Sequence, residues 1–429
     1  MRISRSPIWP ILCAVAATLH AAEPGSGDAM LARVREILRK TPLIDGHNDV
    51  PWIYRDKAKD HLDQIDLAGD TTRREKPMQT DIPRLRKGGV GGVFWSVYVP
   101  TDLAGPRAVT AVLEQIDLVK RLVERYPETL ELALTSSDVR RIHSTGKIAS
   151  LIGMEGGHAI DDSLGVLRQM YACGARYMTL THWENTAWAD AGTDTPSRGG
   201  LSPFGELVVK EMNRLGMLVD LSHVSDATMN DALDISAAPI VFSHSSARAL
   251  CGHPRNVPDE VLRRLPANGG VVMVNFAPGF VSEKVRDWNA AKDAEEARWA
   301  SLFPGDEDRK KREMEVWRST HEAPVATLGQ VADHIDHIRS VAGIDHVGLG
   351  SDFDGIDHGP VGLEDVSRFP DLLAELLRRG YREEEAAKVA GGNVLRVLGK
   401  AEEVAARLTR ERPPSDARID EVQEIGKPK

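Results

Sequence analysis

Residues 206–244, ELVVKEMNRLGMLVDLSHVSDATMNDALDISAAPIVFSH, place a helical pattern and two strand patterns in one short stretch. In 206–215 the apolar residues recur three and four positions apart, which is typical of an amphipathic helix. The β-rich runs 217–223 and 240–244 are each preceded by a helical pattern, and they end in His223 and His244. The stretch therefore predicts helices that alternate with strands, with a polar residue at the end of each strand.

The same alternation extends along most of the chain. β-rich runs occur at 43–49, 90–99, 148–155, 177–182, 217–223, 240–244, 270–276 and 347–352, and most of them end in Asp, Glu or His. This pattern indicates an α/β protein with a parallel sheet and outer helices, and eight repeats is the number at which such a sheet closes into a TIM-type (β/α)8 barrel. A doubly wound open sheet is the alternative, but no Gly-x-Gly-x-x-Gly fingerprint follows any of the runs.

Three segments lie outside the repeats. Residues 281–325 are rich in Glu, Lys, Arg and Trp, and they predict a helical insertion after the seventh strand. A helix pair over 370–398 follows the eighth strand, and charge dominates from residue 401 onward. We expect one barrel domain over 30–400 and a polar, loosely held extension over 401–429.

Composition narrows the classes of function. Of 429 residues 41% are hydrophobic, and 64 acidic against 54 basic residues give a net charge of -10. This apolar fraction argues against intrinsic disorder, and an acidic chain without a basic block argues against a nucleic-acid partner. The composition is compatible with a protein that acts on small polar substrates.

The N-terminus has the form of a secretory signal peptide over 1–22. Arg2 and Arg5 precede an apolar run at 8–17, and small residues follow at Ala21 and Ala22. The run is about half the roughly 20 residues that a spanning helix needs, so we expect a cleaved leader; a disordered tail is the alternative. The C-terminus lacks a GPI-type hydrophobic tail, so the mature protein is expected to be exported, periplasmic or secreted, and soluble without a membrane anchor.

Potential metal ligands stand at the ends of several predicted strands. They are His47, Asp49, Glu155, His223 and His244. In a barrel the carboxyl ends of the strands surround one pocket, so these five side chains are expected to hold two divalent ions, with Glu155 bridging them. Nitrogen and oxygen ligands without thiolates fit two Zn²⁺ best, with manganese, cobalt or iron as alternatives. Two ions about 3.5–4 Å apart would clamp a water and make hydroxide available, which predicts a hydrolase.

Three further residues lie where a hydrolase needs them. His182 ends the fourth strand and is a candidate donor to an oxyanion; the alternative is a histidine satisfied within its polar loop. Arg255 follows the sixth strand and is a candidate for binding a substrate carboxylate; the alternative is a solvated or ion-paired surface arginine. Asp352 ends the eighth strand and is placed for proton transfer, with Asp354 as a competitor for that role. His334, Asp336 and His337 also lie close together in the sequence, but a polar outer face of their helix explains them better than a role in the site does.

At these residues the sequence resembles the membrane dipeptidase family, also called peptidase family M19, from about residue 44 to 397. The matching segments are IDGHND (44–49), GMEGG (153–157), LTHWENTAWAD (180–190), VDLSH (219–223), SHSSAR (243–248), HPRNVP (253–258), GSDFDG (350–355) and GGNVLRV (391–397).

The resemblance implies a role for each matching residue. His47 and Asp49 would hold one zinc, His223 and His244 the other, and Glu155 would bridge them. His182 and Arg255 would contact the substrate, and Asp352 would serve the proton transfers. The resemblance also implies hydrolysis of dipeptides, tolerance for a D-residue at the C-terminal position and a homodimer.

Two rivals to this interpretation remain. A binuclear amidohydrolase would keep the metals but act on N-acyl amino acids, lactams or other amides. A non-catalytic exported binding protein is the rival from another class, and a missing metal ligand would favour it. The complete set of predicted ligands favours an enzyme.

Overall fold

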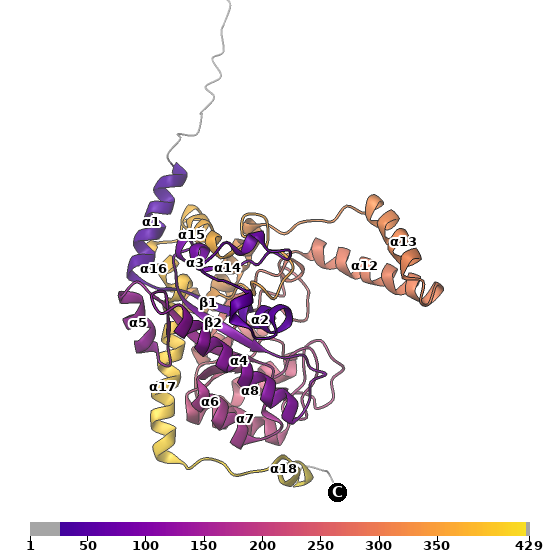
Figure 1. Ribbon diagram of the computed structural model, residues 1–429. Helices are drawn as coiled ribbons and strands as arrows, with labels where there is room; N and C mark the ends of the chain where they lie inside the picture. The colour runs from indigo at the N-terminus through magenta and orange to yellow at the C-terminus, as the bar shows by residue number, and fades with distance from the viewer. Residues whose placement is uncertain (1–25, 426–429) are drawn as a thin grey trace, which may run out of the picture.

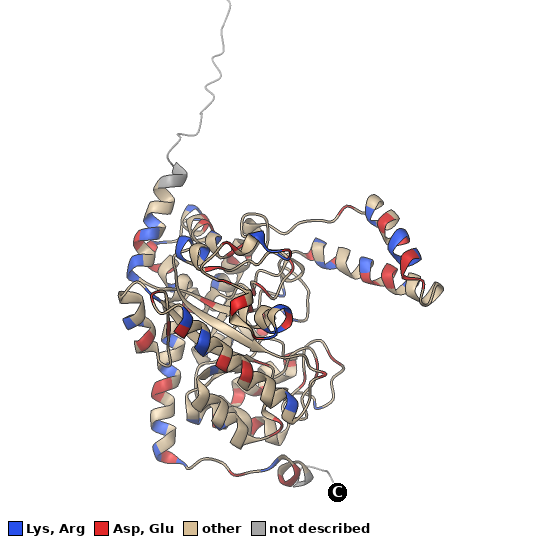
Figure 2. Ribbon diagram, viewed as in Figure 1, with Lys and Arg blue, Asp and Glu red and all other residues tan. Residues whose placement is uncertain are grey.

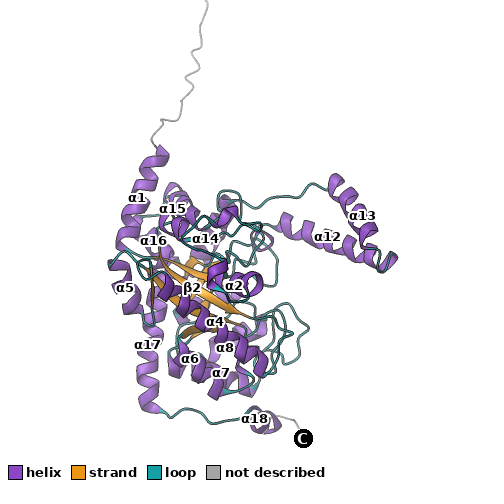
Figure 3. Ribbon diagram, in the orientation of Figure 1, coloured by secondary structure: helices purple, strands orange, loops and turns teal. Residues whose placement is uncertain are grey.

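Parallel strands form the centre of the molecule and helices surround them (Figure 1, Figure 3). The computed structural model describes residues 26–425. The strands are β1 Leu43–Asn48, β2 Val90–Tyr98, β3 Leu130–Leu132, β4 Ile148–Glu155, β5 Ala175–Thr179, β6 Leu218–Asp220, β7 Val241–Phe242, β8 Val271–Val274 and β9 Val347–Leu349. All of their pairings are parallel.

Eight of these strands close into a barrel. The sheet runs β2-β1-β9-β8-β7-β6-β5-β4, and pairing of β2 with β4, from Gly92 opposite Ala149 to Tyr98 opposite Glu155, joins its ends. The predicted TIM-type barrel is therefore confirmed. β3 was not predicted; it pairs only with the first residues of β4.

The helices cover the outside of the barrel. Before the insertion they are α1 Ser26–Lys40, α2 Val50–Ala58, α3 Ile82–Lys87, α4 Pro106–Arg125, α5 Ser136–Ser144, α6 Leu164–Cys173, α7 Pro203–Leu215, α8 Asp226–Ile235, α9 Asp259–Leu262, α10 Leu265–Asn268 and α11 Pro278–Val281. Helix α7 shows why they form where they do. Ser202 caps its first turn, Pro203 occupies the first position and Gly216 ends it in the left-handed conformation.

The predicted insertion after the seventh predicted strand, which is β8, is a pair of helices. Helix α12 is Glu283–Leu302 and helix α13 is Glu307–Thr320, and together they project from the barrel as an arm (Figure 1). Acidic and basic residues are interspersed along both helices (Figure 2), and Val285 and Met314 are their buried residues. The charged composition of 281–325 therefore reflects helices with little core to face.

Helices α14 Leu328–Ala342, α15 Phe369–Arg378, α16 Glu383–Ala387, α17 Asn393–Glu411 and α18 Ile419–Ile425 complete the chain. The expected extension from residue 401 begins inside α17. Ala401, Val404 and Leu408 are buried there, at helical spacing, and α17 packs against α7. The expected signal peptide at 1–22 lies outside the described residues. Within the described part of the chain, no helix has the length and apolar character to cross a membrane.

Candidate metal centre and active site

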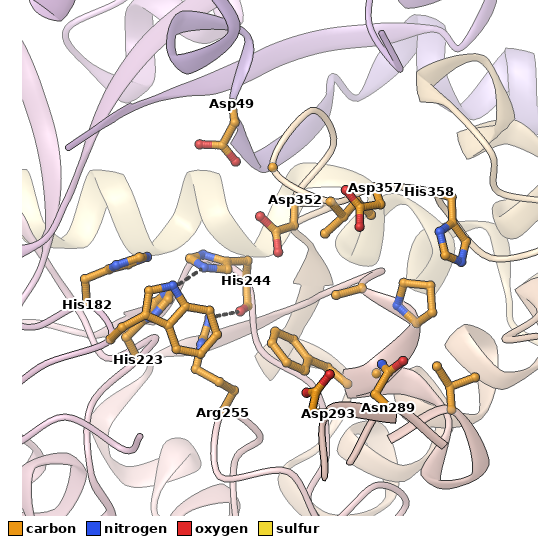
Figure 4. A pocket seen from close by; sticks show the side chains of 18 of the residues that line it. Asp49, His182, His223, His244, Arg255, Asn289, Asp293, Asp352, Asp357 and His358 are labelled. Carbon is orange, nitrogen blue, oxygen red and sulfur yellow. Dashed lines mark hydrogen bonds between the residues drawn. The ribbon is translucent and has the colours of Figure 1, made fainter. Parts of the chain in front are cut away.

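The predicted ligands meet at the carboxyl end of the barrel. Figure 4 shows Asp49, His223 and His244 among them. His47 lies in β1, Asp49 directly follows it, and Glu155 is the last residue of β4. His223 and His244 follow β6 and β7. All five side chains are at least 94% buried, so the strand ends bring together a dry cluster of acids and imidazoles.

Glu155 stands at the centre of this cluster. Its Oε2 is 3.4 Å from Nε2 of His47, and its Oε1 is 3.0 Å from Nε2 of His223 and 3.3 Å from Nε2 of His244. Nε2 of His47 is also 3.4 Å from Oδ2 of Asp49. Burial alone would raise the pKa of Glu155, but the charges of His47 and His182 and hydrogen bonds from His182 and His223 hold it well below its usual value. Each carboxylate oxygen therefore faces a different set of histidines, as a bridging ligand must.

The hydrogen bonds behind the histidines show that this cluster fits cations. Ser243 Oγ donates to Oδ2 of Asp220 at 2.5 Å and lies 2.8 Å from Nδ1 of His244. A hydroxyl has one proton, so with Asp220 ionised Ser243 accepts the Nδ1 proton of His244 and leaves Nε2 as a lone pair. That lone pair is 3.0 Å from Nε2 of His223, and burial lowers the pKa of both rings well below the usual value. The neutral imidazoles of His223 and His244, which face the carboxylate of Glu155 in a dry site, are arranged for metal ions.

Three overlapping sets of ligand atoms each lie within 4.8 Å of one another: His47, Glu155 and His244; Glu155, His182 and His223; and His47, Asp49 and Asp352. The sets cross the predicted division of ligands, because His244 groups with His47 and their ring centroids are 3.9 Å apart. His182 and Asp352, which the sequence suggested for substrate contact and proton transfer, also lie within ligand distance.

The hydroxyl of Tyr177 contacts the imidazole of His47, although no sequence motif had indicated Tyr177 as a residue of the site. The Tyr177 hydroxyl lies 2.7 Å from Nδ1 of His47, and both side chains are buried. Gly153 is the partner of Tyr177 in the β4–β5 ladder, and a Cβ there would lie 2.0 Å from the Tyr177 ring. Gly153 thus leaves the space through which the tyrosine reaches the histidine and orients it.

We expect Tyr177→Phe to weaken metal binding by about 10–100-fold without unfolding the barrel, because it removes one oxygen and the hydrogen bond that orients His47. Titration of the metal-free protein with Zn²⁺ measures this. Tyr54→Phe is the control, since the Tyr54 hydroxyl donates to the carbonyl of Ile65 and not to a ligand. Equal zinc affinity of Tyr177→Phe and the wild type would contradict a role for this hydroxyl.

Two residues of the cluster have a backbone conformation that is unusual outside glycine. His223 has φ of 73° and Asp352 has φ of 65°. Left-handed conformations of this kind cost about 1 kcal/mol or more and persist where the surrounding structure imposes them, often at functional sites. Here they turn the two side chains toward the cavity just beyond β6 and β9.

Arg255 is buried within the site and not at the surface. Its side chain is 1% exposed, and it donates to Oγ of Ser245 at 3.3 Å and to the carbonyl of His244 at 3.2 Å. Its Nε has no hydrogen-bond partner among the described residues. Burial lowers the pKa of Arg255 to about 10, so the guanidinium is still charged at neutral pH. A buried cation with an N–H to spare is suited to an anionic group of a ligand.

The two candidate acids after β9 have different surroundings. Asp352 lines the cavity, and its Oδ2 accepts from Nδ2 of Asn275 at 2.9 Å. Asp354 points away and is tied to Gln79 through its own N–H and through Oδ1. Burial raises the pKa of each carboxyl to about 7, but only Asp352 of the two is among the cavity residues.

The cluster opens into a cavity of about 570 Å³ (Figure 4). His182, whose Nε2 is 3.5 Å from Oε1 of Glu155, stands beside it with Trp183 and Tyr98. Residues of α12 form part of the opposite wall. The prediction that His334 lies on a polar outer helix face is wrong, because its side chain is buried. Its Nδ1 accepts from the N–H of Ala247, and its Nε2 lies 3.0 Å from the carbonyl of Val281.

Comparison with known proteins identifies the family. The model of the family described as membrane dipeptidase, peptidase family M19, matches residues 31–412. The chain belongs to the membrane dipeptidase family. A relative named dipeptidase verJ from Clonostachys rogersoniana is 42% identical over 392 residues, covering 89% of each chain. The membership predicted from the motifs is therefore confirmed, and with it the assignment as a metallo-dipeptidase.

Solved structures of a probable dipeptidase and of a metallo peptidase share the fold. The probable dipeptidase PvdM from Pseudomonas aeruginosa matches with a TM-score of 0.73 and 27% identity, over 88% of this chain and 100% of that one. A metallo peptidase from Rhodobacter sphaeroides, solved with a phosphinate mimic of the dipeptide L-Ala-D-Ala, matches with a TM-score of 0.65 and 25% identity, over 84% and 99%. The barrel and its strand-end cluster thus belong to a metallo-dipeptidase scaffold.

Proposed function

We propose that this protein is an exported dipeptidase that uses two Zn²⁺ ions and accepts either an L- or a D-residue at the C-terminal position. The observation that carries the proposal is the pairing of the Glu155 cluster with buried Arg255 in one cavity. Because Arg255 would bind a carboxylate beside the hydrolytic centre, the substrate is limited to a short peptide whose free C-terminus lies next to the bond that is cleaved. The ligand set supports zinc, because it contains imidazoles and carboxylates without thiolates.

Other parts of the proposal rest on separate observations. The Rhodobacter sphaeroides relative, solved with an L-Ala-D-Ala mimic, supports a D-residue at the C-terminal position. The basic, apolar and small-residue segments of 1–22 support export. The resemblance to the family supports a homodimer.

The residues of the cavity would have separate roles in metal binding, substrate binding and proton transfer. When bound, the two ions lower the pKa of water toward about 7 and polarise the peptide carbonyl. His47, Asp49, Glu155, His223 and His244 would hold them. Arg255 binds the C-terminal carboxylate, and His182 donates to the oxygen on which negative charge develops. Asp352 accepts a proton from the attacking water and delivers one to the leaving amine.

Metal analysis combined with a substrate panel tests the function. We expect two zinc ions per chain and chelator-sensitive cleavage of Ala-Ala with L- or D-alanine in the second position. N-acetyl-alanine and N-acetylated Ala-Ala serve as comparison substrates for the rival amidohydrolase activity. Preference for the acetylated compounds, or full activity in metal-free protein, would overturn the proposal.

Arg255→Ala is expected to raise KM for a dipeptide by about 30-fold or more, since loss of a buried charge contact costs about 2–5 kcal/mol. Steady-state kinetics with Ala-Ala and with its C-terminal amide measure this. The amide lacks the carboxylate, so the substitution should change its turnover much less. An equal effect on both substrates would show that Arg255 does not bind the carboxylate.

A further inference from the structure

One face of the arm helix α12 lies against the active-site cavity. Val285, Trp288, Asn289, Lys292 and Asp293 line the cavity and are spaced three and four residues apart, so they form a single stripe along the helix. Asn289 and Asp293 lie across the cavity from His182 in Figure 4. The first half of α12 is therefore a wall of the site, although the rest of the arm projects into solvent (Figure 1).

Helix α13 and the segment after it hold Trp288 in this wall. The Trp288 indole N–H donates to the carbonyl of His321 at 3.1 Å. Its ring centroid is 5.5 Å from that of Trp317, and the Trp317 and His321 rings are stacked 4.4 Å apart. Because its one polar group is already bonded, the indole offers only apolar surface to a ligand.

The charges next to Trp288 neutralise each other. Lys292 and Asp293 form an ion pair at 3.4 Å, and the Asp293 side chain is 70% exposed. Neither group is left as an unpaired charge deep in the cavity. The wall is thus suited to an apolar group rather than to an ionic one.

The base of the arm contacts the loop that carries Arg255. The carboxylate of Glu283, the first residue of α12, accepts from the N–H of Gly252 at 2.7 Å, in the same loop as Arg255. The guanidinium of Arg255 lies 5.5 Å from the ring centroid of Phe280, in the short helix that leads into α12. A substrate residue whose carboxylate is bound by Arg255 is therefore the one nearest to this wall.

We propose that Trp288 is a specificity-determining residue whose indole face contacts the side chain of the substrate's C-terminal residue and favours large apolar side chains. This inference rests on the proposed dipeptidase function and on the role of Arg255 in it. A Cβ-only C-terminal residue leaves the indole uncovered, whereas a leucine or phenylalanine side chain removes apolar surface of both partners from water.

Two dipeptide series test the inference: Ala-X, with X as Gly, Ala, Leu and Phe, and X-Gly with the same variation. Trp288→Ala is expected to lower the ratio of kcat/KM for Ala-Phe to that for Ala-Gly about tenfold, while the X-Gly series keeps its order. Trp288→Phe should retain most of the preference. Trp299→Ala is the matched control, because Trp299 lies on the same helix, stacks on Phe303 and is outside the cavity.

The outcomes separate the inference from the proposed function. Equal loss of activity on Ala-Gly and Ala-Phe, or an effect confined to the X-Gly series, overturns the role of Trp288 while dipeptidase activity stands. A wild type that cleaves none of these dipeptides overturns the proposed function and the inference with it. If Trp288→Ala does not fold, Trp288→Gln provides the comparison, and an unchanged Ala-Phe to Ala-Gly ratio for Trp288→Gln would contradict the inference.

Discussion

Replacing Glu155 by glutamine is expected to abolish binding of one of the two proposed metal ions and to lower kcat/KM for Ala-Ala about a thousandfold. Glutamine keeps the shape of the side chain but loses the charge and one of the two acceptor oxygens that face separate sets of histidines. A bound ion contributes several kcal/mol of charge stabilisation to hydrolysis, and about 4 kcal/mol corresponds to a factor of about 10³.

Metal content and activity of the purified variant measure this effect together. Glu211→Gln is the control, since Glu211 is also buried but pairs with Arg214 and Arg168 far from the cavity ligands. We expect Glu211→Gln to lower stability and to leave the zinc content unchanged. Two full equivalents of zinc in Glu155→Gln would contradict a bridging role for Glu155.

The sequence predicts the barrel and its site because parallel strands carry their last residues to one end. The apolar pattern of the sequence depends more directly on burial than on strand pairing, however. The predicted strands are therefore longer than the paired strands of the structure. Leu180 and Leu221 are fully buried although they lie beyond β5 and β6, so the predicted strands extend past the ladders. His182, His223, His244 and Asp352 therefore lie in the segments after the strands, where two of them adopt positive φ.

Contacts between distant segments are what the sequence could not supply. Gly153 and Tyr177 become neighbours through the β4–β5 register, and only that register places a hydroxyl against His47. Arg255 follows a strand like many surface arginines, and its burial depends on packing against Phe280 and His244. The charged pattern of α12 hides its role as a wall, because Trp288 acquires its position from α13 and the residues after it.

Replacing Asp352 by asparagine is expected to lower kcat for dipeptides by about 10²–10⁴-fold, the usual contribution of a positioned acid or base. Asparagine keeps an oxygen that accepts from Asn275 but cannot carry a proton between the water and the amine. Asp354→Asn is the matched control: it is two residues away, buried, and bonded to Gln79 outside the cavity. A larger loss of kcat in Asp354→Asn than in Asp352→Asn would reverse the assignment.

Asp352→Asn has a second expected consequence, in the stability of the metal-free protein. Burial raises the pKa of Asp352 to about 7, above its ordinary value of 3.8, so the folded state binds a proton that the unfolded state releases. The contribution of this carboxyl to the free energy of unfolding is therefore full below about pH 4 and is lost as the pH rises through 7. We expect the Tm of metal-free Asp352→Asn to exceed that of the metal-free wild type by more at pH 8 than at pH 4. The same Tm difference at pH 4 and pH 8 would show that the buried carboxyl of Asp352 does not take up a proton on folding. Proton uptake on folding would then play no part in the catalytic role of Asp352.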